Sequence, residues 1–281
     1  MKLVRTIKDL NLAVTEARSK GNKIGFVPTM GALHKGHLSL VEQAAKKCTF
    51  VVVSIFVNPT QFNDRNDLKR YPRDLNRDLE LLRSVPCKLV FAPEVKEMYP
   101  NPDTRKFNFG PLEEVMEGTH RPGHFNGVAQ IVSKLFDFVK PDCAFFGQKD
   151  FQQLVIIKEL VHQMNTNIEI IPCPIIREND GLAMSSRNQL LSKEQRKSAA
   201  LISKVLFESR NKAASFSVNE LKKWVIDEIN KSPLLDVEYF DIVDDIRLEP
   251  VISWKPENGV VGCIAVQCGA IRLIDNITYN H

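Results

Sequence analysis

Residues 50–57 of this chain read FVVVSIFV, a run in which Ser54 is the one polar side chain. A strand of this kind has both of its faces buried, as in the middle of a parallel sheet that helices cover on both sides. Similar short apolar runs occur at 23–28, 88–93, 143–147 and 167–174. Helical patterns separate these runs, and strands that alternate with helices predict a doubly wound parallel sheet.

The pattern changes after about residue 174. Two helical stretches come first, at 193–213 and 218–232, and strand-like stretches follow near 234–243, 259–268 and 270–277. We therefore expect an α/β fold in two domains. The first, residues 1–174, is a Rossmann-like doubly wound parallel sheet, and the second, residues 175–281, is a smaller α+β domain.

Charge and cysteine usage exclude several classes of protein. The net charge is +4, and no block of five or six like charges forms a nucleic-acid arm or a membrane-binding stripe. The six cysteines occur singly without a C-x-x-C pair, which favours buried free thiols over a zinc or redox motif. No leader or membrane-spanning run is apparent. We expect a cytoplasmic protein with no nucleic-acid or membrane partner.

The stretch PTMGALHKGH at 28–37 joins a predicted strand to a helix expected to begin near His37. Open α/β sheets bind ligands at this edge, and helix amides there favour anions. Gly31 and Gly36 allow close backbone approach, and His34 and His37 can donate to one anion. Two alternatives are ordinary surface histidines and a metal site, although H-x-x-H lacks most of a zinc signature. The loop matches neither GxxxxGK[ST] nor GxGxxG.

The motifs along the chain resemble those of one enzyme family. HKGH resembles the HxGH signature of class I nucleotidyltransferases, and FVPTMGALHKGHLSLV at 26–41 is similar to pantoate–β-alanine ligases. Further matches are SIFVNPTQF (54–62), YPRDL (71–75), RPGHFNGV (121–128), FGQKDFQQL (146–154) and DGLAMSSRN (180–188). The resemblance implies that ATP, with Mg²⁺, condenses (R)-pantoate with β-alanine through pantoyl adenylate, releasing AMP and pyrophosphate. It also implies a homodimer and a second domain that closes over the ATP site.

The resemblance also implies a set of site residues. The catalytic ones are His34, His37, Lys149 and Arg187. The substrate-binding ones are Gln61, Gln153 and Asn58. The ATP-binding ones are Met30, Gly31, Ala32, Leu33, His34, Lys35, Gly36, His37, Gly147, Gln148, Lys149, Asp150, Ile176, Met184, Ser185, Ser186 and Arg187.

The chemistry of these side chains suits such roles, and each has a plainer alternative. Lys149 can supply a charge for phosphate, whereas Asp150 can serve either as an acceptor or as a helix cap. The stretch AMSSRN at 183–188 resembles a mobile phosphate-binding loop, and otherwise it is a serine-rich turn. Gln61 and Gln153 suit the hydroxyls of pantoate, although most glutamines lie on the surface.

The polar stretch QFNDRNDLKRYPRDL at 61–75 is a candidate lid that keeps water from the adenylate. Two rival functions remain at this point. One is another adenylate-forming or nucleotidyl-transferring enzyme with a different acceptor. The other is a nucleotide-binding regulatory or RNA-binding module that has lost the chemistry, which the absence of a basic stripe with interleaved aromatic residues disfavours.

Overall fold

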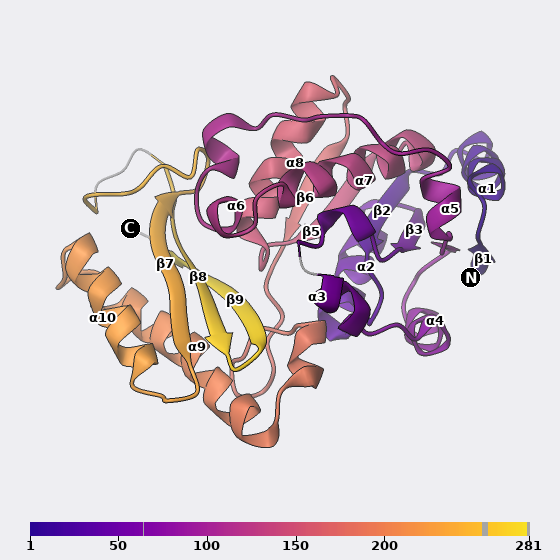
Figure 1. Ribbon diagram of the computed structural model, residues 1–281. Helices are drawn as coiled ribbons and strands as arrows, with labels where there is room; N and C mark the ends of the chain where they lie inside the picture. The colour runs from indigo at the N-terminus through magenta and orange to yellow at the C-terminus, as the bar shows by residue number, and fades with distance from the viewer. Residues whose placement is uncertain (64, 255–257, 280–281) are drawn as a thin grey trace. The chain divides into compact units, whose positions relative to one another are not determined.

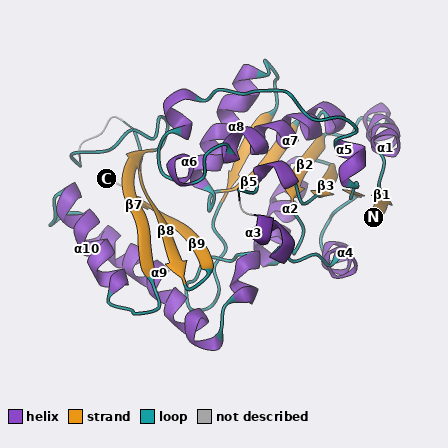
Figure 2. Ribbon diagram, viewed as in Figure 1, coloured by secondary structure: helices purple, strands orange, loops and turns teal. Residues whose placement is uncertain are grey.

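The computed structural model describes residues 1–63, 65–254 and 258–279, and these residues form two compact units (Figures 1 and 2). The first unit consists of Met1–Gly110, His120–Gln148 and Ile156–Pro174. The second consists of Pro111–Thr119, Lys149–Val155 and the described part of Ile175–His281. Two short segments that precede residue 175, Pro111–Thr119 and Lys149–Val155, therefore belong to the second unit.

The first unit contains a six-stranded parallel sheet in the order β1-β4-β3-β2-β5-β6. The run FVVVSIFV forms β3, which pairs with β2 on one side and β4 on the other. The predicted parallel sheet is thus confirmed, with its most apolar strand inside. The strands are β1 (Lys2–Val4), β2 (Ile24–Thr29), β3 (Phe50–Ile55), β4 (Leu89–Phe91), β5 (Cys143–Gly147) and β6 (Glu169–Cys173).

Helices cover both faces of this sheet, as two-sided burial of the strands requires. Val27 packs on one face in a buried cluster with Val41 of α2, and Phe26 meets Phe136 of α7 edge-on at 6.3 Å between ring centroids. Adjacent residues of β2 therefore point to opposite helix layers. The helices described before residue 175 are α1 (Ile7–Ser19), α2 (Lys35–Lys47), α3 (Arg65–Arg70), α4 (Leu75–Arg83), α5 (Val95–Met98), α6 (Glu117–His120), α7 (His124–Val139) and α8 (Phe151–Gln163), with 3-10 turns η1 (Pro59–Gln61) and η2 (Gly110–Glu113). Of these, η2 and α6 belong mainly to the second unit, and α8 begins in it.

The second unit contains an antiparallel sheet in the order β7-β8-β9, which Figure 2 shows as long strands beside two helices. Ile264 and Val266 of β8 belong to the same buried cluster as residues of both helices. This arrangement confirms the α+β fold that was predicted after residue 174. The elements are η3 (Ser186–Leu190), α9 (Lys193–Lys212), α10 (Val218–Asn230), β7 (Asp236–Asp244), β8 (Val260–Cys268) and β9 (Ile271–Tyr279).

A charged cluster fixes segment 111–119 to this sheet. Glu117 is nearly buried, and its two carboxylate oxygens accept hydrogen bonds from the guanidinium of Arg272 at 2.7 and 2.8 Å. The hydroxyl of Tyr239 donates to the same carboxylate at 2.8 Å. Burial, with the negative charge of Glu117 beside it, raises the pKa of the Tyr239 phenol. A buried charge requires such partners, so the cluster holds this segment in place.

Two further expectations can be compared with the described residues. All six cysteines are buried free thiols, as predicted, and burial raises the pKa of both Cys48 and Cys87 to about 12. Among the helices of residues 1–63, 65–254 and 258–279, none has the length and apolar character needed to cross a membrane.

Candidate active site

The loop between β2 and α2 brings His34 and His37 together. His34 is the N-cap of α2, and its Nδ1 accepts a hydrogen bond from the Gly36 amide at 3.2 Å. The Nδ1 of His37 accepts from the His34 amide at 3.3 Å, which completes a reciprocal capping box. The ring centroids are 4.0 Å apart. The two imidazoles predicted to share one anion therefore lie side by side.

This capping arrangement determines which ring nitrogen carries the proton. A backbone amide can only donate, so the Nδ1 atoms of His34 and His37 both accept and carry no proton. In the neutral ring the proton is then on Nε2. Each imidazole consequently carries its proton on Nε2, and an Nε2–H is a group that can donate to a phosphoryl oxygen.

Helix α2 begins at Lys35, two residues before the expected start near His37, because the His34 ring caps it there. Just before the helix, the amides of Ala32 and Leu33 donate to the carboxylate of Asp78 at 3.0 and 2.7 Å. These two loop amides are therefore bonded to the protein. Anion binding by the first amides of the helix itself stays a prediction.

Asp78 holds the loop in an unusual conformation, and the sequence analysis did not identify it. Gly31 and Ala32 both have positive φ, at 79° and 50°. A Cβ on Gly31 would lie 2.9 Å from Asp78 Oδ2, so glycine is required there on two counts. Burial raises the pKa of Asp78, and the two amides oppose that shift. The available signal was a carboxylate in line with Leu75 and Leu82 on the apolar side of a predicted helix.

Gln61, a substrate-binding candidate of the first unit, lies beside the loop between β2 and α2, which we call the histidine loop. Its Nε2 donates to the sulfur of Met30 at 3.2 Å, so the structure brings these two predicted site residues together. The backbone carbonyl of Gln61 lies 2.8 Å from Nδ1 of His124. The motif RPGHFNGV, for which the sequence assigned no role, thus supplies part of the support for Gln61.

The η1 turn, which carries Gln61, also packs closely against α7. A Cβ on Gly127 would lie 2.5 Å from the carbonyl oxygen of Thr60 and 2.9 Å from the Cα of Gln61. The absence of a side chain at Gly127 is therefore what allows the η1 turn to approach the helix.

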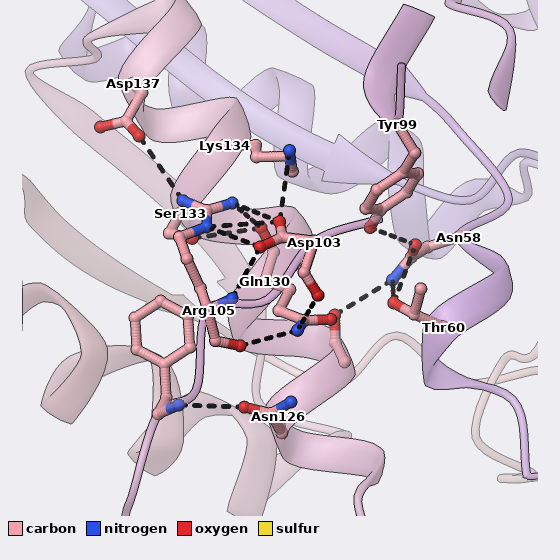
Figure 3. Close-up of polar contacts among 12 residues, drawn as sticks. Asn58, Thr60, Tyr99, Asp103, Arg105, Asn126, Gln130, Ser133, Lys134 and Asp137 are labelled. Atoms are coloured by element: carbon pink, nitrogen blue, oxygen red, sulfur yellow. Dashed lines mark hydrogen bonds and ion pairs between the residues drawn. The ribbon is translucent and has the colours of Figure 1, made fainter. Parts of the chain in front are cut away.

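Asn58, also predicted to bind substrate, is only 1% exposed. Its Nδ2 lies within hydrogen-bond distance of Thr60 Oγ1, Gln61 Oε1 and Gly127 O. Its Oδ1 accepts from the hydroxyl of Tyr99 at 2.7 Å, as Figure 3 shows. The amide of Asn58 is thus committed to protein groups.

In the second unit, Lys149 and Asp150 precede α8. The ammonium of Lys149 lies 3.7 Å from the carboxylate of Asp150, whose side chain is about half exposed. The two neighbouring glutamines then differ. Gln152 is buried and bonds to the Glu117 amide and to two backbone carbonyls, whereas Gln153 is half-buried in the first turn of the helix. Gln152 is structural, and Gln153 stays the candidate.

The predicted phosphate loop follows a tight hairpin in the same unit. Met184 donates its amide to Ile176 at 3.0 Å, which brings these two predicted ATP-binding residues together. Ser185 caps η3, because its side chain accepts from the Arg187 amide at 3.3 Å. Ser186 and Arg187 lie in the first turn of η3.

An ion pair that the sequence analysis missed anchors this hairpin to β9. The guanidinium of Arg177 donates to both carboxylate oxygens of Asp275, at 2.6 and 2.9 Å, and also to the carbonyl of Gly181 at 3.1 Å. Burial raises the pKa of Asp275, and Arg177 and Lys149 oppose the shift. The signal in the sequence was an arginine directly before the glycine turn and a lone aspartate within an apolar strand.

The remaining predicted positions lie at strand ends or in the candidate lid. Gly147 ends β5, and the amide of Gln148 donates to Cys173 at the end of β6. In segment 61–75 the structure has helix α3, and Asp64 lies outside the described residues. Movement of this segment stays a prediction.

Comparison with known proteins shows that nearly the whole chain is similar to a single family. The profile of the family described as pantoate-beta-alanine ligase matches residues 2–278. A protein named pantothenate synthetase from Bacteroides thetaiotaomicron is 57% identical over 279 residues, which cover 99% of each chain.

Two solved structures extend the similarity to three dimensions. Pantothenate synthetase from Thermus thermophilus is 41% identical and matches with a TM-score of 0.94 over 100% of both chains. Pantoate-beta-alanine ligase from Francisella tularensis, complexed with beta-gamma ATP and beta-alanine, is 35% identical with a TM-score of 0.82, covering 99% of this chain and 98% of that one. Together with the paired imidazoles after β2, these matches establish that the chain belongs to the pantoate–β-alanine ligase family.

Proposed function

We propose that this chain carries out the ligation of its family, the ATP-dependent condensation of (R)-pantoate with β-alanine, through a pantoyl adenylate. The observation that carries the proposal is the pair of Nε2–H imidazoles fixed by the capping box at the carboxyl end of β2. Such an edge of a parallel sheet is where α/β proteins bind nucleotides. The related Francisella protein, whose structure is named as a complex with beta-gamma ATP and beta-alanine, supports both ligands here.

In the first step, a carboxylate oxygen of pantoate attacks the α-phosphorus of ATP and pyrophosphate leaves. A carboxylate is already nucleophilic, so the protein must mainly align it and stabilise the charge that grows on the phosphoryl oxygens. We assign that stabilisation to His34 and His37. We assign the charges of the β- and γ-phosphates to Lys149 and Arg187, since a guanidinium matches phosphate geometry.

In the second step, the amine of β-alanine attacks the carbonyl carbon of the adenylate. The new C–N bond replaces the C–O bond, and AMP leaves with the oxygen that came from pantoate. The amine loses a proton as pantothenate forms. The same N–H donors of His34 and His37 that stabilised the α-phosphoryl group serve here as well, because AMP is the leaving group.

The remaining assignments follow the sequence-based predictions. We assign ATP binding to residues 30–37, 147–150, Ile176 and 184–187, and the polar groups of pantoate to Gln61 and Gln153. Asn58 belongs with them as a support rather than a ligand, because its buried amide is committed to Tyr99, Thr60, Gln61 and Gly127.

Mg²⁺ is also part of the proposal. The described residues hold no group of three or more His, Cys, Asp or Glu side chains arranged for a metal ion. Mg²⁺ commonly binds through substrate phosphates and waters with one or two carboxylates rather than in an all-protein cage. The half-exposed carboxylate of Asp150 is a suitable oxygen donor of this kind. When bound with ATP, the ion would neutralise charge on the phosphates.

A cytoplasmic location and a homodimer complete the proposal. Six buried free thiols suit a reducing compartment. The family resemblance implies the dimer. Sedimentation equilibrium should give about twice the chain mass of 31.9 kDa, whereas a mass equal to that of one chain would contradict it.

ATP–pyrophosphate exchange tests the first step alone. With ATP, Mg²⁺ and labelled pyrophosphate, we expect label to enter ATP when pantoate is present and β-alanine is absent. Exchange that does not need pantoate would indicate another acceptor. Absence of exchange, with ATP binding intact by calorimetry, would indicate a binding module.

A further inference from the structure

The buried amide of Asn58 has only one possible orientation. The carbonyl oxygen of Gly127 can only accept, and it lies 3.1 Å from one end of this amide. That end must therefore be the nitrogen, Nδ2. The opposite end is then Oδ1, and the hydroxyl of Tyr99 at 2.7 Å must donate to it.

Tyr99 is well suited to act as this donor. Burial raises the pKa of its phenol, so the hydroxyl keeps its proton at neutral pH. The ammonium of Lys134 lies over its ring, 5.1 Å from the centroid, and also contacts the buried carboxylate of Asp103 at 3.2 Å. Figure 3 shows the hydroxyl of Tyr99 pointing to Asn58 and the ammonium of Lys134 paired with Asp103. Tyr99 is thus held from one side while it donates on the other.

The orientation of Asn58 in turn sets the orientation of Gln61. Asn58 Nδ2 lies 3.2 Å from the side-chain amide of Gln61, so the atom of Gln61 facing it must be the acceptor Oε1. If Gln61 were turned around, two N–H groups would face each other. Its Nε2 accordingly points away from Asn58, toward the sulfur of Met30. Gln61 presents hydrogen-bond donors, not its acceptor, on the side of the histidine loop.

We propose that Tyr99, acting through Asn58, is a positioning residue that orients Gln61 to donate to an oxygen of pantoate. The inference rests on the proposed function, because it takes pantoate as the ligand of Gln61. It also states which end of the amide the substrate meets. A carboxylate or hydroxyl oxygen of pantoate fits that end, whereas a ligand that offers only N–H donors does not.

The test compares steady-state kinetics for Tyr99→Phe, Gln61→Ala and the double variant. Tyr99→Phe removes only the hydroxyl, and Asn58 Oδ1 then keeps the longer contact with Thr60 at 3.3 Å. We expect the KM for pantoate to rise about fivefold, the effect of one net hydrogen bond, with the KM for ATP unchanged. Gln61→Ala should raise the KM for pantoate about tenfold or more, and adding Tyr99→Phe to it should change nothing further.

A matched control separates positioning from general destabilisation. Tyr279 is a buried tyrosine of the second unit, with its hydroxyl 2.8 Å from that of Ser209. Tyr279→Phe should lower the melting temperature but leave the KM for pantoate unchanged. Asn58→Asp provides a second variant if Tyr99→Phe folds poorly. Its carboxylate cannot donate to Gln61, so the KM for pantoate should rise by more than in Tyr99→Phe.

The outcomes distinguish this inference from the proposed function. Suppose that Gln61→Ala raises the KM for pantoate. The positioning role is overturned if Tyr99→Phe leaves that KM unchanged, or if Tyr99→Phe raises it by the same factor whether or not Gln61 is present. In either case the assignment of Gln61 to pantoate stands. A wild-type KM in Asn58→Asp would overturn the positioning role as well. If Gln61→Ala has no effect, pantoate is not the ligand of Gln61 and the positioning role fails, whereas pantoate-dependent ATP–pyrophosphate exchange would still support the proposed ligation.

Discussion

Replacing Gly127 with alanine tests whether α7 sets the position of Gln61. The new Cβ would lie 2.5 Å from the carbonyl oxygen of Thr60, and an ordinary contact begins at 3.4 Å. Helix and turn must therefore separate by about 0.9 Å at that point, the difference between 3.4 and 2.5 Å. Displacing a substrate-positioning group by about 1 Å can cost on the order of 10²-fold in rate. We expect kcat/KM for pantoate to fall by that order.

The effect on stability should be much smaller than the effect on rate. Overpacking costs about 1–3 kcal/mol, but alanine in place of glycine inside a helix returns about 1 kcal/mol. The net loss in the free energy of unfolding is therefore about 0–2 kcal/mol. Urea denaturation measures this loss, and pantoate-dependent pyrophosphate release measures the rate.

Gly262 offers a matched control in the second unit. A Cβ there would lie 2.9 Å from the rings of Phe240 and Tyr279, so Gly262→Ala introduces similar crowding away from Gln61. It should destabilise the fold but leave the KM for pantoate unchanged. A Gly127→Ala variant with wild-type kcat/KM for pantoate would refute the reasoning.

Three further predictions follow from single side chains. His37→Ala should slow adenylation by about 10²-fold or more while the circular dichroism spectrum is kept, since a preorganised donor is lost; near-normal pyrophosphate release would remove His37 from the site. Arg272→Met should lower the free energy of unfolding by about 3–5 kcal/mol in urea, because it leaves the buried carboxylate of Glu117 uncompensated; a loss below about 1 kcal/mol would contradict this. The guanidinium of Arg105 beside Asp103 lowers the pKa of that carboxyl from 3.8, so its contribution to stability is present above pH 3.8 and is lost as the pH falls through the lower folded value. Asp103→Asn should therefore lose less stability than the wild type when urea unfolding is followed from pH 5 to pH 2, and parallel curves would argue against the pair.

Much of the fold follows from local sequence patterns. The run at 50–57 predicted a strand buried on both faces, and β3 has a strand on each side and helices over both faces. Thr6 directly precedes the apolar pattern of α1, and its side chain caps that helix by accepting from the amide of Asp9. These features are local in the chain, so apolar periodicity and capping residues are sufficient to predict them.

Features that depend on distant partners could not be predicted in this way. Strand β1 is short, and its pairing with β4 defines it. Segment 111–119 belongs to the second unit because Glu117 meets Arg272, which is 155 residues away in the chain. No periodicity encodes such a pairing.

The same distinction applies within the candidate site. The histidines and glutamines were found because their chemistry and motifs are visible in the sequence. Asp78 and Tyr99 act only through the groups they hold, and their partners lie 41 or more residues away. A polar residue in an apolar stripe, as at Asp78, is the one signal that the sequence provided.

Isotope transfer tests the adenylate pathway most directly. Pantoate labelled with ¹⁸O in its carboxylate is incubated with the protein, ATP, Mg²⁺ and β-alanine, and the phosphorus products are examined by mass spectrometry. Attack on the α-phosphorus predicts that one ¹⁸O appears in AMP and none in pyrophosphate. Formation of ADP together with labelled phosphate would show attack on the γ-phosphorus and would contradict the account.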